Sequence, residues 1–512
     1  MILTASYMLK SIKISIKDTV VYGLGNIAVK IVGFLLIPIY TDKKYLSMDD
    51  FGVLGILEIS ALVLAASIAS GLPQSLTRWF WDKEHKKNQK GIFFMSISTQ
   101  TVVAILFCLL LIPLSGTLSE LIFSKPDFSR VLTLVILASA IQAINNIVNT
   151  LMRLQSRSVL YTITNLFKLT LVLSLTLFFI ISKKMGLEGI FLAQVIGNSL
   201  IVLLLLGYTI KNSRLFFDKS IFRSMNAYGF PLLLANISAV ALNVIDRFSL
   251  NSLAPLKFVA LYTFAFKITS VLKLVIVDSI RLALGPMMIK RIDSPDSKRF
   301  YSKVLLYSSY VMMFAIVGVS LFAYEITKVI AGDKEFWNAV VIIPVLSLSI
   351  FFVNMKEVTV YGLHIAKKTK IIGIIVIGAT IISFALNMLL IPVWSITGSA
   401  IATLLSQFIY WFACYYYSQK VFYIPYEIRK ITTLFLCGVV LSFSSLLING
   451  MDLLPRMIIK TTELISFPFI LYLFHFYEPV ELQAIRGFYV KWSRIKNFSA
   501  NLKSLKGISE EI

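Results

Sequence analysis

Residues 131–151 read VLTLVILASAIQAINNIVNTL, a run without charge and mostly apolar. About 20 apolar residues in a helix cross the roughly 30 Å hydrocarbon core of a bilayer, so this run predicts a membrane span. Similar runs follow one another from Val20 to Phe476. Because the backbone in lipid must satisfy its own hydrogen bonds, they predict a helix bundle. The composition, 57% hydrophobic and 15% charged, exceeds what a soluble core of 512 residues would bury.

The apolar runs predict an all-α polytopic membrane protein with about fourteen transmembrane helices. All predicted loops are short, so no extramembrane domain is expected. Any function is therefore expected inside the helix bundle or at its two membrane surfaces. The predicted spans are residues 20–40, 53–71, 92–112, 131–151, 161–181, 192–207, 231–250, 258–284, 304–322, 339–363, 371–390, 396–416, 432–447 and 458–474.

Lysine and arginine are distributed unevenly between the two sets of alternating loops. The set that includes the N-terminus holds about three times as many as the other, which predicts that both termini are cytoplasmic. The net charge of +23 is therefore interpreted as a topological signal, and no nucleic-acid partner is expected. The three cysteines and three histidines are scattered, so neither a disulfide framework nor a metal site is predicted.

Short matches 206–209 residues apart suggest a duplication. They pair Tyr22-Gly23 with Tyr228-Gly229, Phe51-Gly52 with Phe258-Val259, and Gly189 with Gly398. Six spans in each half predict two parallel six-helix lobes with a site at their interface. The predicted units are residues 1–210, residues 211–418, two additional spans in 419–476, and a basic cytoplasmic tail in 477–512.

Polar side chains recur at helical spacing inside several predicted spans, which places each set on one helix face. Intramembrane polar groups usually face the bundle interior, either as hydrogen-bonding glue between helices or as cavity lining. Arg153 and Arg281 also suit a role as anchors at the membrane surface. The stripes are Tyr22, Asn26 and Lys30; Gln142, Asn146, Asn149 and Arg153; Tyr161, Asn165 and Lys168; Asn236, Asn243 and Arg247; Lys267, Ser270, Asp278 and Arg281; and Asn354, Glu357, Tyr361 and His364.

Cations outnumber anions within the predicted spans. The cations are Lys30, Lys168, Arg247, Lys267, Lys273 and Lys356, and the anions are Glu58, Asp246, Asp278 and Glu357. Lys30 has no acidic residue one helical turn away, and an unpaired lysine at mid-bilayer costs about 2.5–3.5 kcal/mol. These charges predict a hydrated cavity with spare positive charge, suited to an anionic substrate such as a phosphate.

Several motifs resemble those of the Wzx-type polysaccharide flippase family, the polysaccharide transporter branch of the multidrug/oligosaccharidyl-lipid/polysaccharide exporter superfamily. The motifs are YGLGN at 22–26 with GFLLIP at 33–38, YLSMDDFG at 45–52, GLP at 71–73 with RWF at 78–80, and YGFP at 228–231 with Asp246-Arg247. Together with the span number and charge bias, the resemblance covers nearly the whole chain.

The resemblance implies a non-enzymatic flippase in the bacterial inner membrane. Such a protein moves undecaprenyl-diphosphate-linked oligosaccharide repeat units by alternating access, for O-antigen, lipopolysaccharide, capsule or exopolysaccharide synthesis. It implies a polysaccharide polymerase and a chain-length regulator as partners, and coupling to a proton or sodium gradient without a cofactor. The cationic site residues it implies are Lys30, Arg247, Lys168 and Lys267, and Glu58 and Asp246 are the candidate ion-coupling carboxylates. The polar stripes add Asn26, Asn146, Asn149 and Asn243 as candidate cavity lining.

Other functions remain open at this point. A lipid II flippase and a multidrug or cation antiporter belong to the same superfamily, but the antiporter should carry acidic residues without the excess lysine and arginine. A membrane-embedded lipid-linked-sugar polymerase or glycosyltransferase would be expected to have a large outer loop or an outer acidic pair. Asp49-Asp50 is such a pair, although a helix cap explains it better. An O-acyltransferase would be expected to have a histidine deep in a span, whereas His364 is near a span's end.

Overall fold

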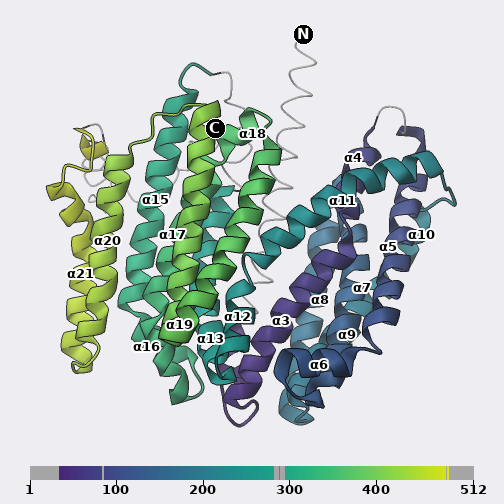
Figure 1. Cartoon of the computed structure of the whole chain (residues 1–512), viewed down its shortest axis with the longest axis horizontal. Coiled ribbons are helices and arrows are strands. Elements are labelled where there is room, and N and C mark those ends of the chain that lie inside the picture. Colours follow the sequence, from purple (N-terminus) through teal and green to yellow (C-terminus); the bar gives the residue numbers. More distant parts are fainter. Residues whose placement is uncertain (1–33, 83–85, 282–287, 289–293, 480, 484–512) are drawn as a thin grey trace, which may run out of the picture.

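Helices make up nearly all of the chain that the structure, a computed structural model, describes. The described residues are 34–82, 86–281, 288, 294–479 and 481–483, and this part of the chain contains no strand (Figure 1). The predicted all-α membrane fold is therefore confirmed. The first predicted span, apart from its last residues, and most of the basic tail lie outside the described residues.

The helices follow the predicted spans closely. In chain order they are α2 (Ile37–Tyr40), α3 (Met48–Ala69), α4 (Leu72–Phe80), η1 (Lys86–Asn88), α5 (Gln89–Leu111), α6 (Ser115–Phe123), η2 (Pro126–Phe128), α7 (Ser129–Leu154), α8 (Ser158–Leu177), η3 (Phe178–Ser182), α9 (Gly186–Leu204), α10 (Leu206–Asn212), α11 (Lys219–Ala241), α12 (Ile245–Leu253), α13 (Leu256–Leu272), η4 (Lys273–Val277), α15 (Ser297–Leu321), α16 (Ala323–Ile330), η5 (Lys334–Val341), α17 (Ile343–Thr359), α18 (Tyr361–Ile365), α19 (Thr369–Val421), α20 (Ile428–Ile448) and α21 (Leu453–Leu473).

Ten helical segments of the described chain are long and apolar enough to cross a membrane, and the bent pair α11 and α12 makes an eleventh. The 53-residue helix α19 would be about 80 Å long if straight, far more than one bilayer needs. Ser395 breaks it with φ 49° and ψ −125°, between the predicted spans at 371–390 and 396–416. The total of fourteen spans stays a prediction.

Residues 231–250, predicted as one span, do not form one straight helix. The helix α11 begins earlier, at Lys219, where the Asp218 side chain accepts hydrogen bonds from the backbone N–H groups of Ser220 and Ile221. It ends at Ala241, and the chain then turns by 55° into α12. Apolar length alone does not report such a break, although the polar residues Asn243, Asp246 and Arg247 gather at it.

The helices gather into two groups that converge at one end of the molecule. Figure 1 shows α3 to α10 on one side and α13 to α21 on the other, with α11 reaching across between them. The groups meet where α3 comes close to α12 and α13, at the end of the molecule that carries α6 and α16 and is called here the α6 end. They separate toward α4, called here the α4 end. The predicted unit boundaries at 210 and 418 fall within α10 and α19, and the internal repeat stays a prediction.

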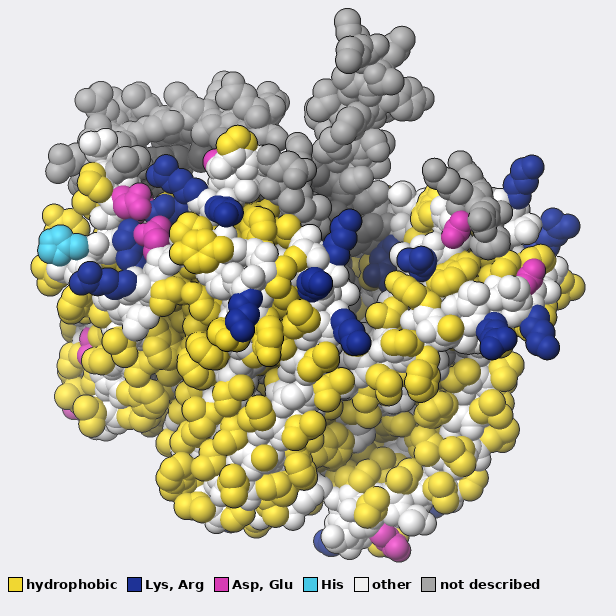
Figure 2. All heavy atoms as spheres, turned by 45° about the horizontal axis from the view of Figure 1, so that its top comes forward, with side chains coloured by type: hydrophobic (Ala, Val, Ile, Leu, Met, Phe, Trp, Pro, Cys, Tyr) yellow, Lys and Arg dark blue, Asp and Glu magenta, His cyan; other side chains and the backbone are white. Residues whose placement is uncertain are grey.

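The surface matches a bilayer setting. Figure 2 shows hydrophobic side chains covering the flanks, while lysine and arginine side chains gather around the α4 end. This end carries the loops that the charge distribution predicts to be cytoplasmic. The protein is therefore a multi-pass membrane protein whose two ends differ in charge.

The α6 end is closed by direct packing of α3 on α13. A Cβ atom added at Gly52 would lie 2.5 Å from the carbonyl oxygen of Leu256, and one added at Gly55 would lie 2.3 Å from Oγ1 of Thr263. Real Cβ atoms essentially never come so close, so the two glycines allow the two helices to touch. The ring of Phe51 packs edge-on against Phe336, with centroids 5.2 Å apart.

We predict that Gly52→Val lowers stability by about 1–3 kcal/mol, because the larger side chain must push the α13 backbone away. Thermal unfolding of the purified protein in detergent measures this. Gly116→Ala on α6 is the matched control, since nothing lies within 4 Å of a Cβ atom added there. Equal stability of the two variants would contradict the assigned contact.

Candidate functional site

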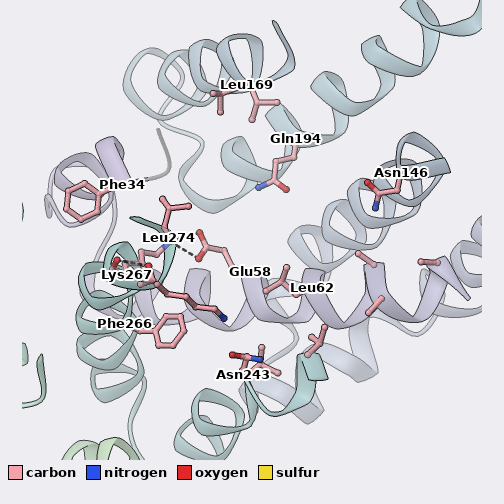
Figure 3. A pocket seen from close by; sticks show the side chains of 18 of the residues that line it. Phe34, Glu58, Leu62, Asn146, Leu169, Gln194, Asn243, Phe266, Lys267 and Leu274 are labelled. Carbon is pink, nitrogen blue, oxygen red and sulfur yellow. Dashed lines mark hydrogen bonds and ion pairs between the residues drawn. The ribbon is translucent and has the colours of Figure 1, made fainter. Parts of the chain in front are cut away.

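A cavity of about 1250 Å³ lies between the two groups of helices. Its described lining comes from α2, α3, α4, α7, α8, α9, α11, α12, α13 and η4, with no contribution from α15 to α21. Figure 3 shows side chains from several of these helices pointing into it. The cavity reaches the surface at the α4 end, where Gln74 and Arg153 are exposed.

The charged lining of this cavity is predominantly positive. Its described lining includes four cationic side chains but a single carboxylate, Glu58. The four cations are Arg153, Arg247, Lys267 and Lys273. Six side-chain amides also line the cavity, and they come from Gln74, Asn146, Asn149, Gln194, Asn236 and Asn243. The cavity therefore combines excess positive charge with many neutral hydrogen-bonding groups.

Glu58 and Lys267 form an ion pair between the two groups of helices. The Lys267 ammonium donates to both oxygens of the Glu58 carboxylate, at 2.8 and 2.7 Å (Figure 3). Glu58 lies about one turn beyond Gly55 on α3, and Lys267 about one turn beyond Thr263 on α13. The pair therefore marks the place where the tight packing of the α6 end gives way to the cavity. Both side chains remain partly exposed, 33% for Glu58 and 20% for Lys267.

Arg247 sits just beyond the break between α11 and α12. Its Nη2 donates to the backbone carbonyl of Asn243 at 2.6 Å, and its guanidinium lies 4.3 Å from the ring centroid of Phe266. Its Nε is 3.5 Å from Oδ1 of Asp246. The break frees backbone carbonyls from the helical pattern, and Arg247 satisfies one of them while lining the cavity.

Asp246 is buried behind the cavity and is not among its lining residues. The Tyr262 hydroxyl donates to its Oδ2 at 2.6 Å and lies 2.9 Å from the hydroxyl of Thr403. This network links α12, α13 and α19. The arrangement is that of a structural ion pair and hydrogen-bond network.

The remaining predicted site residues lie in different places. Asn146, Asn149 and Asn243 line the cavity, whereas Lys168 does not. Lys168 instead donates to the side-chain oxygen of Gln142, which in turn donates to Asn146 at 3.0 Å. Lys30 and Asn26 lie outside the described residues.

The polar stripe of Asn354, Glu357, Tyr361 and His364 belongs to the second group of helices and runs from the buried Asn354 to the exposed His364. Asn354 is fully buried and donates to the hydroxyl of Ser308 at 3.3 Å. Lys356 pairs with its neighbour Glu357. None of these residues lines the cavity.

Sequence reasoning missed two of the six amides, Gln74 and Gln194. Gln194 lies within the apolar helix α9, one turn before Asn198, and two amides at helical spacing in such a run are a detectable signal. Gln74 carries no such signal, because it follows the loop before α4 and only the fold turns it toward the cavity.

A second connection between the two groups lies on the outer surface of the α6 end. The Lys43 ammonium is 2.7 Å from Oε1 of Glu335 and 3.2 Å from Oδ2 of Asp333. Hydrogen bonds to Glu335 and then Asp333 raise the pKa of Lys43. The backbone N–H of Glu335, followed by Lys43, lowers the pKa of the Asp333 carboxyl. Because Lys43 is exposed, this pair should contribute little to stability.

We predict that Lys267→Ala lowers stability by about 1–2 kcal/mol, because it leaves the partly buried Glu58 carboxylate without its cation. The double variant Glu58→Gln with Lys267→Gln should lose less stability than the sum of the losses in the single variants Glu58→Gln and Lys267→Gln. Thermal or denaturant unfolding in detergent tests this as a double-mutant cycle. Lys43→Ala serves as the exposed control with little effect, and additive losses at Glu58 and Lys267 would contradict the coupling.

Comparison with known proteins agrees with the fold. A family model described as "Polysaccharide biosynthesis protein" matches residues 15–292. No curated protein matches significantly.

Solved transporter structures share the architecture. The lipid II flippase MurJ in an inward closed conformation has a TM-score of 0.69 at 12% identity, over 88% of this chain and 99% of that chain. An inward-facing multidrug resistance MATE family transporter of the MOP superfamily has a TM-score of 0.63 at 13% identity, over 81% and 95%. A MOP superfamily transporter from Pyrococcus furiosus has a TM-score of 0.53 at 13% identity, over 82% and 96%.

At these identities the structural likeness shows the fold alone, which is that of transporters and flippases. The family match covers more than half of the chain and confirms the resemblance read from its motifs. The chain belongs to the polysaccharide biosynthesis protein family.

Proposed function

We propose that this protein is a flippase that moves undecaprenyl-diphosphate-linked oligosaccharide repeat units across the bacterial inner membrane. The observation that carries the proposal is the cavity between the two groups of helices, with four cations, one carboxylate and six amides in its described lining. The family membership supports a substrate of polysaccharide synthesis. No covalent bond changes in such a transfer, so we propose a transporter and not an enzyme.

The cationic groups suit the diphosphate of the carrier lipid. A guanidinium such as that of Arg247 binds phosphate oxygens through two N–H groups, and an ammonium such as that of Lys267 binds them as a point charge. Inside a membrane protein these interactions are stronger than in water, because the surroundings are less polarisable. The same cationic groups would repel a cationic drug, which argues against a multidrug or cation antiporter.

The amides suit the sugar part of the same substrate. Asn146 and Asn149 lie on α7, while Asn236 lies on α11 and Asn243 just beyond its end, so they reach the cavity from both flanks. A side-chain amide both donates and accepts hydrogen bonds, as sugar hydroxyl groups do. Neutral groups of this kind can bind a glycan whether or not its sugars are charged.

The Glu58–Lys267 pair offers a way to link cargo binding to a change of access. The pair joins α3 to α13 directly above the closed α6 end. A diphosphate that reaches Lys267 competes with Glu58 for the same ammonium, and success weakens the connection between the groups. Glu58 then becomes the carboxylate available for a proton or sodium ion, which gives a route for coupling to an ion gradient.

The charge distribution supports a direction for this transfer. The cavity reaches the surface at the α4 end, where lysine and arginine gather (Figure 2). By the positive-inside rule this end faces the cytoplasm, where lipid-linked repeat units are made. Export then requires opening of the α6 end toward the periplasm, where a polymerase and a chain-length regulator would use the repeat unit.

We predict that Arg247→Ala reduces surface polysaccharide at least about tenfold, since loss of a charged contact to phosphate costs more than one factor of ten in affinity. The measurement is polysaccharide delivery in a deletion strain that expresses each variant, with protein level followed by immunoblot. Lys211→Ala is the control, because Lys211 is exposed on α10 and does not line the cavity. Normal delivery by a well-expressed Arg247→Ala would count against the proposal.

We predict that deletion of the gene leaves viable cells that lack a surface polysaccharide and accumulate its lipid-linked repeat unit. Radiolabelled lipid extracts of the deletion strain measure this accumulation. Accumulation of lipid II with cell lysis would instead assign the protein to peptidoglycan synthesis, the role named for MurJ.

A further inference from the structure

A second hollow of about 700 Å³ continues from the main cavity at the α4 end. It shares Pro73, Gln74, Thr150 and Arg153 with the lining of the main cavity. Its other lining residues are Thr77, Arg78, Leu154 and Tyr228. This second hollow is called here the vestibule. A substrate that enters from the α4 end passes the vestibule before it reaches the Glu58–Lys267 pair.

The short helix α4 presents its polar face to the vestibule. Ser70 and Gly71 adopt left-handed backbone conformations, with φ 50° and 69°, and these turn the chain between α3 and α4. The helix then buries Leu72, Ser75, Leu76 and Phe80. Its opposite face, with Gln74, Thr77 and Arg78, lines the vestibule.

Close contact between α4 and α11 holds the wall of the vestibule together. A Cβ atom added at Gly71 would lie 2.2 Å from the carbonyl oxygen of Gly229. The Ser75 hydroxyl donates to the backbone carbonyl of Met225 at 2.8 Å. These contacts place Tyr228 of α11 next to Arg78 of α4. Arg78 is exposed, and the packing of the two helices brings the Tyr228 ring beside its side chain.

Arg78 is held by aromatic rings and by no acid. Its guanidinium carbon lies 5.1 Å from the ring centroid of Tyr228 and 5.5 Å from that of Trp79. The two rings pack edge to face, 5.5 Å apart. In the described part of the chain the Arg78 guanidinium has neither an ion pair nor a hydrogen bond. Stacking uses the face of a guanidinium and leaves its N–H edges available.

Arg153 adds a second guanidinium to the vestibule. Its one hydrogen bond in the described structure goes from Nη2 to the hydroxyl oxygen of Thr150, at 3.1 Å. No carboxylate of the described residues pairs with it. The Gln74 amide and the Tyr228 hydroxyl likewise have no hydrogen-bond partner there. Two guanidinium groups and two neutral polar groups thus face one hollow with most of their hydrogen-bonding capacity unused.

We infer that the vestibule binds an acidic sugar of the glycan, a residue that carries a carboxylate. This inference rests on the proposed flippase function and adds a subsite to it. A planar guanidinium matches a carboxylate through two parallel N–H bonds. The amide and hydroxyl groups beside it match sugar hydroxyls, which a diphosphate lacks. The deeper cations, Arg247 and Lys267, already provide for the diphosphate.

A purely structural role for Arg78 is the competing interpretation, since a stacked arginine could simply join α4 to α11. The two interpretations differ in what a ligand does. A structural clamp affects stability and all ligands alike, whereas a sugar subsite distinguishes acidic from neutral oligosaccharides.

The test measures binding of three probes to the full chain in lipid nanodiscs by titration calorimetry. Trigalacturonate represents an acidic oligosaccharide, maltotriose a neutral one, and geranylgeranyl diphosphate a lipid diphosphate without sugar. Arg78→Gln should weaken trigalacturonate binding by about tenfold and leave geranylgeranyl diphosphate binding unchanged. Arg78→Lys should restore part of the affinity, because an ammonium keeps the charge but not the two-pronged geometry. Arg223→Gln, which removes an exposed charge elsewhere on α11, should change neither affinity.

Other outcomes overturn the inference. No trigalacturonate binding by the parent protein, or an equal loss in Arg223→Gln, would reject the subsite. Loss of geranylgeranyl diphosphate binding in Arg78→Gln would assign the vestibule to the carrier phosphate instead. A selective loss in Arg78→Gln together with normal polysaccharide delivery by Arg247→Ala would keep the sugar subsite and reject the flippase. Loss of delivery in Arg247→Ala without any effect of Arg78→Gln would reject the subsite alone.

Discussion

The ion pair between Glu58 and Lys267 is the interaction on which the organisation of this bundle depends. It is the point at which α3 and α13 stop touching and begin to enclose a cavity. On one side of the pair, Gly52 and Gly55 let the two helices pack backbone to backbone. On the other side, polar groups face a space large enough for a substrate. An ion pair at such a boundary is partly hydrated, so it is neither as costly to form as a buried pair nor as weak as a surface pair.

Charge inside this protein is balanced locally but not over the cavity as a whole. The membrane makes a bare cation expensive, and each described cation that was predicted as a site residue has a partner. Lys267 has Glu58, Arg247 has a freed backbone carbonyl together with Phe266 and Asp246, and Lys168 has Gln142. Nevertheless the described lining holds four cations and one carboxylate. The positive excess inferred from the sequence therefore resides in the sum over the cavity, although Lys267 and Arg247 each have a partner.

Much of the fold could be predicted from the sequence, because apolar length and loop charge are local properties. Helical spacing also grouped Asn146, Asn149 and Arg153 on one face, and that face does line the cavity. Spacing within one helix does not reveal which neighbour a face meets, however. The partnership of Glu58 with Lys267 spans 209 residues of sequence, and Lys168 lies on a predicted polar stripe yet turns to Gln142. The break between α11 and α12 was missed because spans are predicted from apolar length, which takes no account of the polar residues Asn243, Asp246 and Arg247 gathered there.

That break connects the shape of the bundle to the chemistry of the cavity. The helix α11 packs on α3 and α4 of the first group and on α19 of the second, so it bears on both groups at once. A change in their relative angle must therefore be absorbed along α11 or at the break that follows it. Arg247 donates a hydrogen bond to the Asn243 carbonyl at this break and also lines the cavity. Any change in the 55° angle between α11 and α12 consequently moves a cavity-lining cation, so that the position of positive charge in the cavity depends on how far apart the two groups of helices stand.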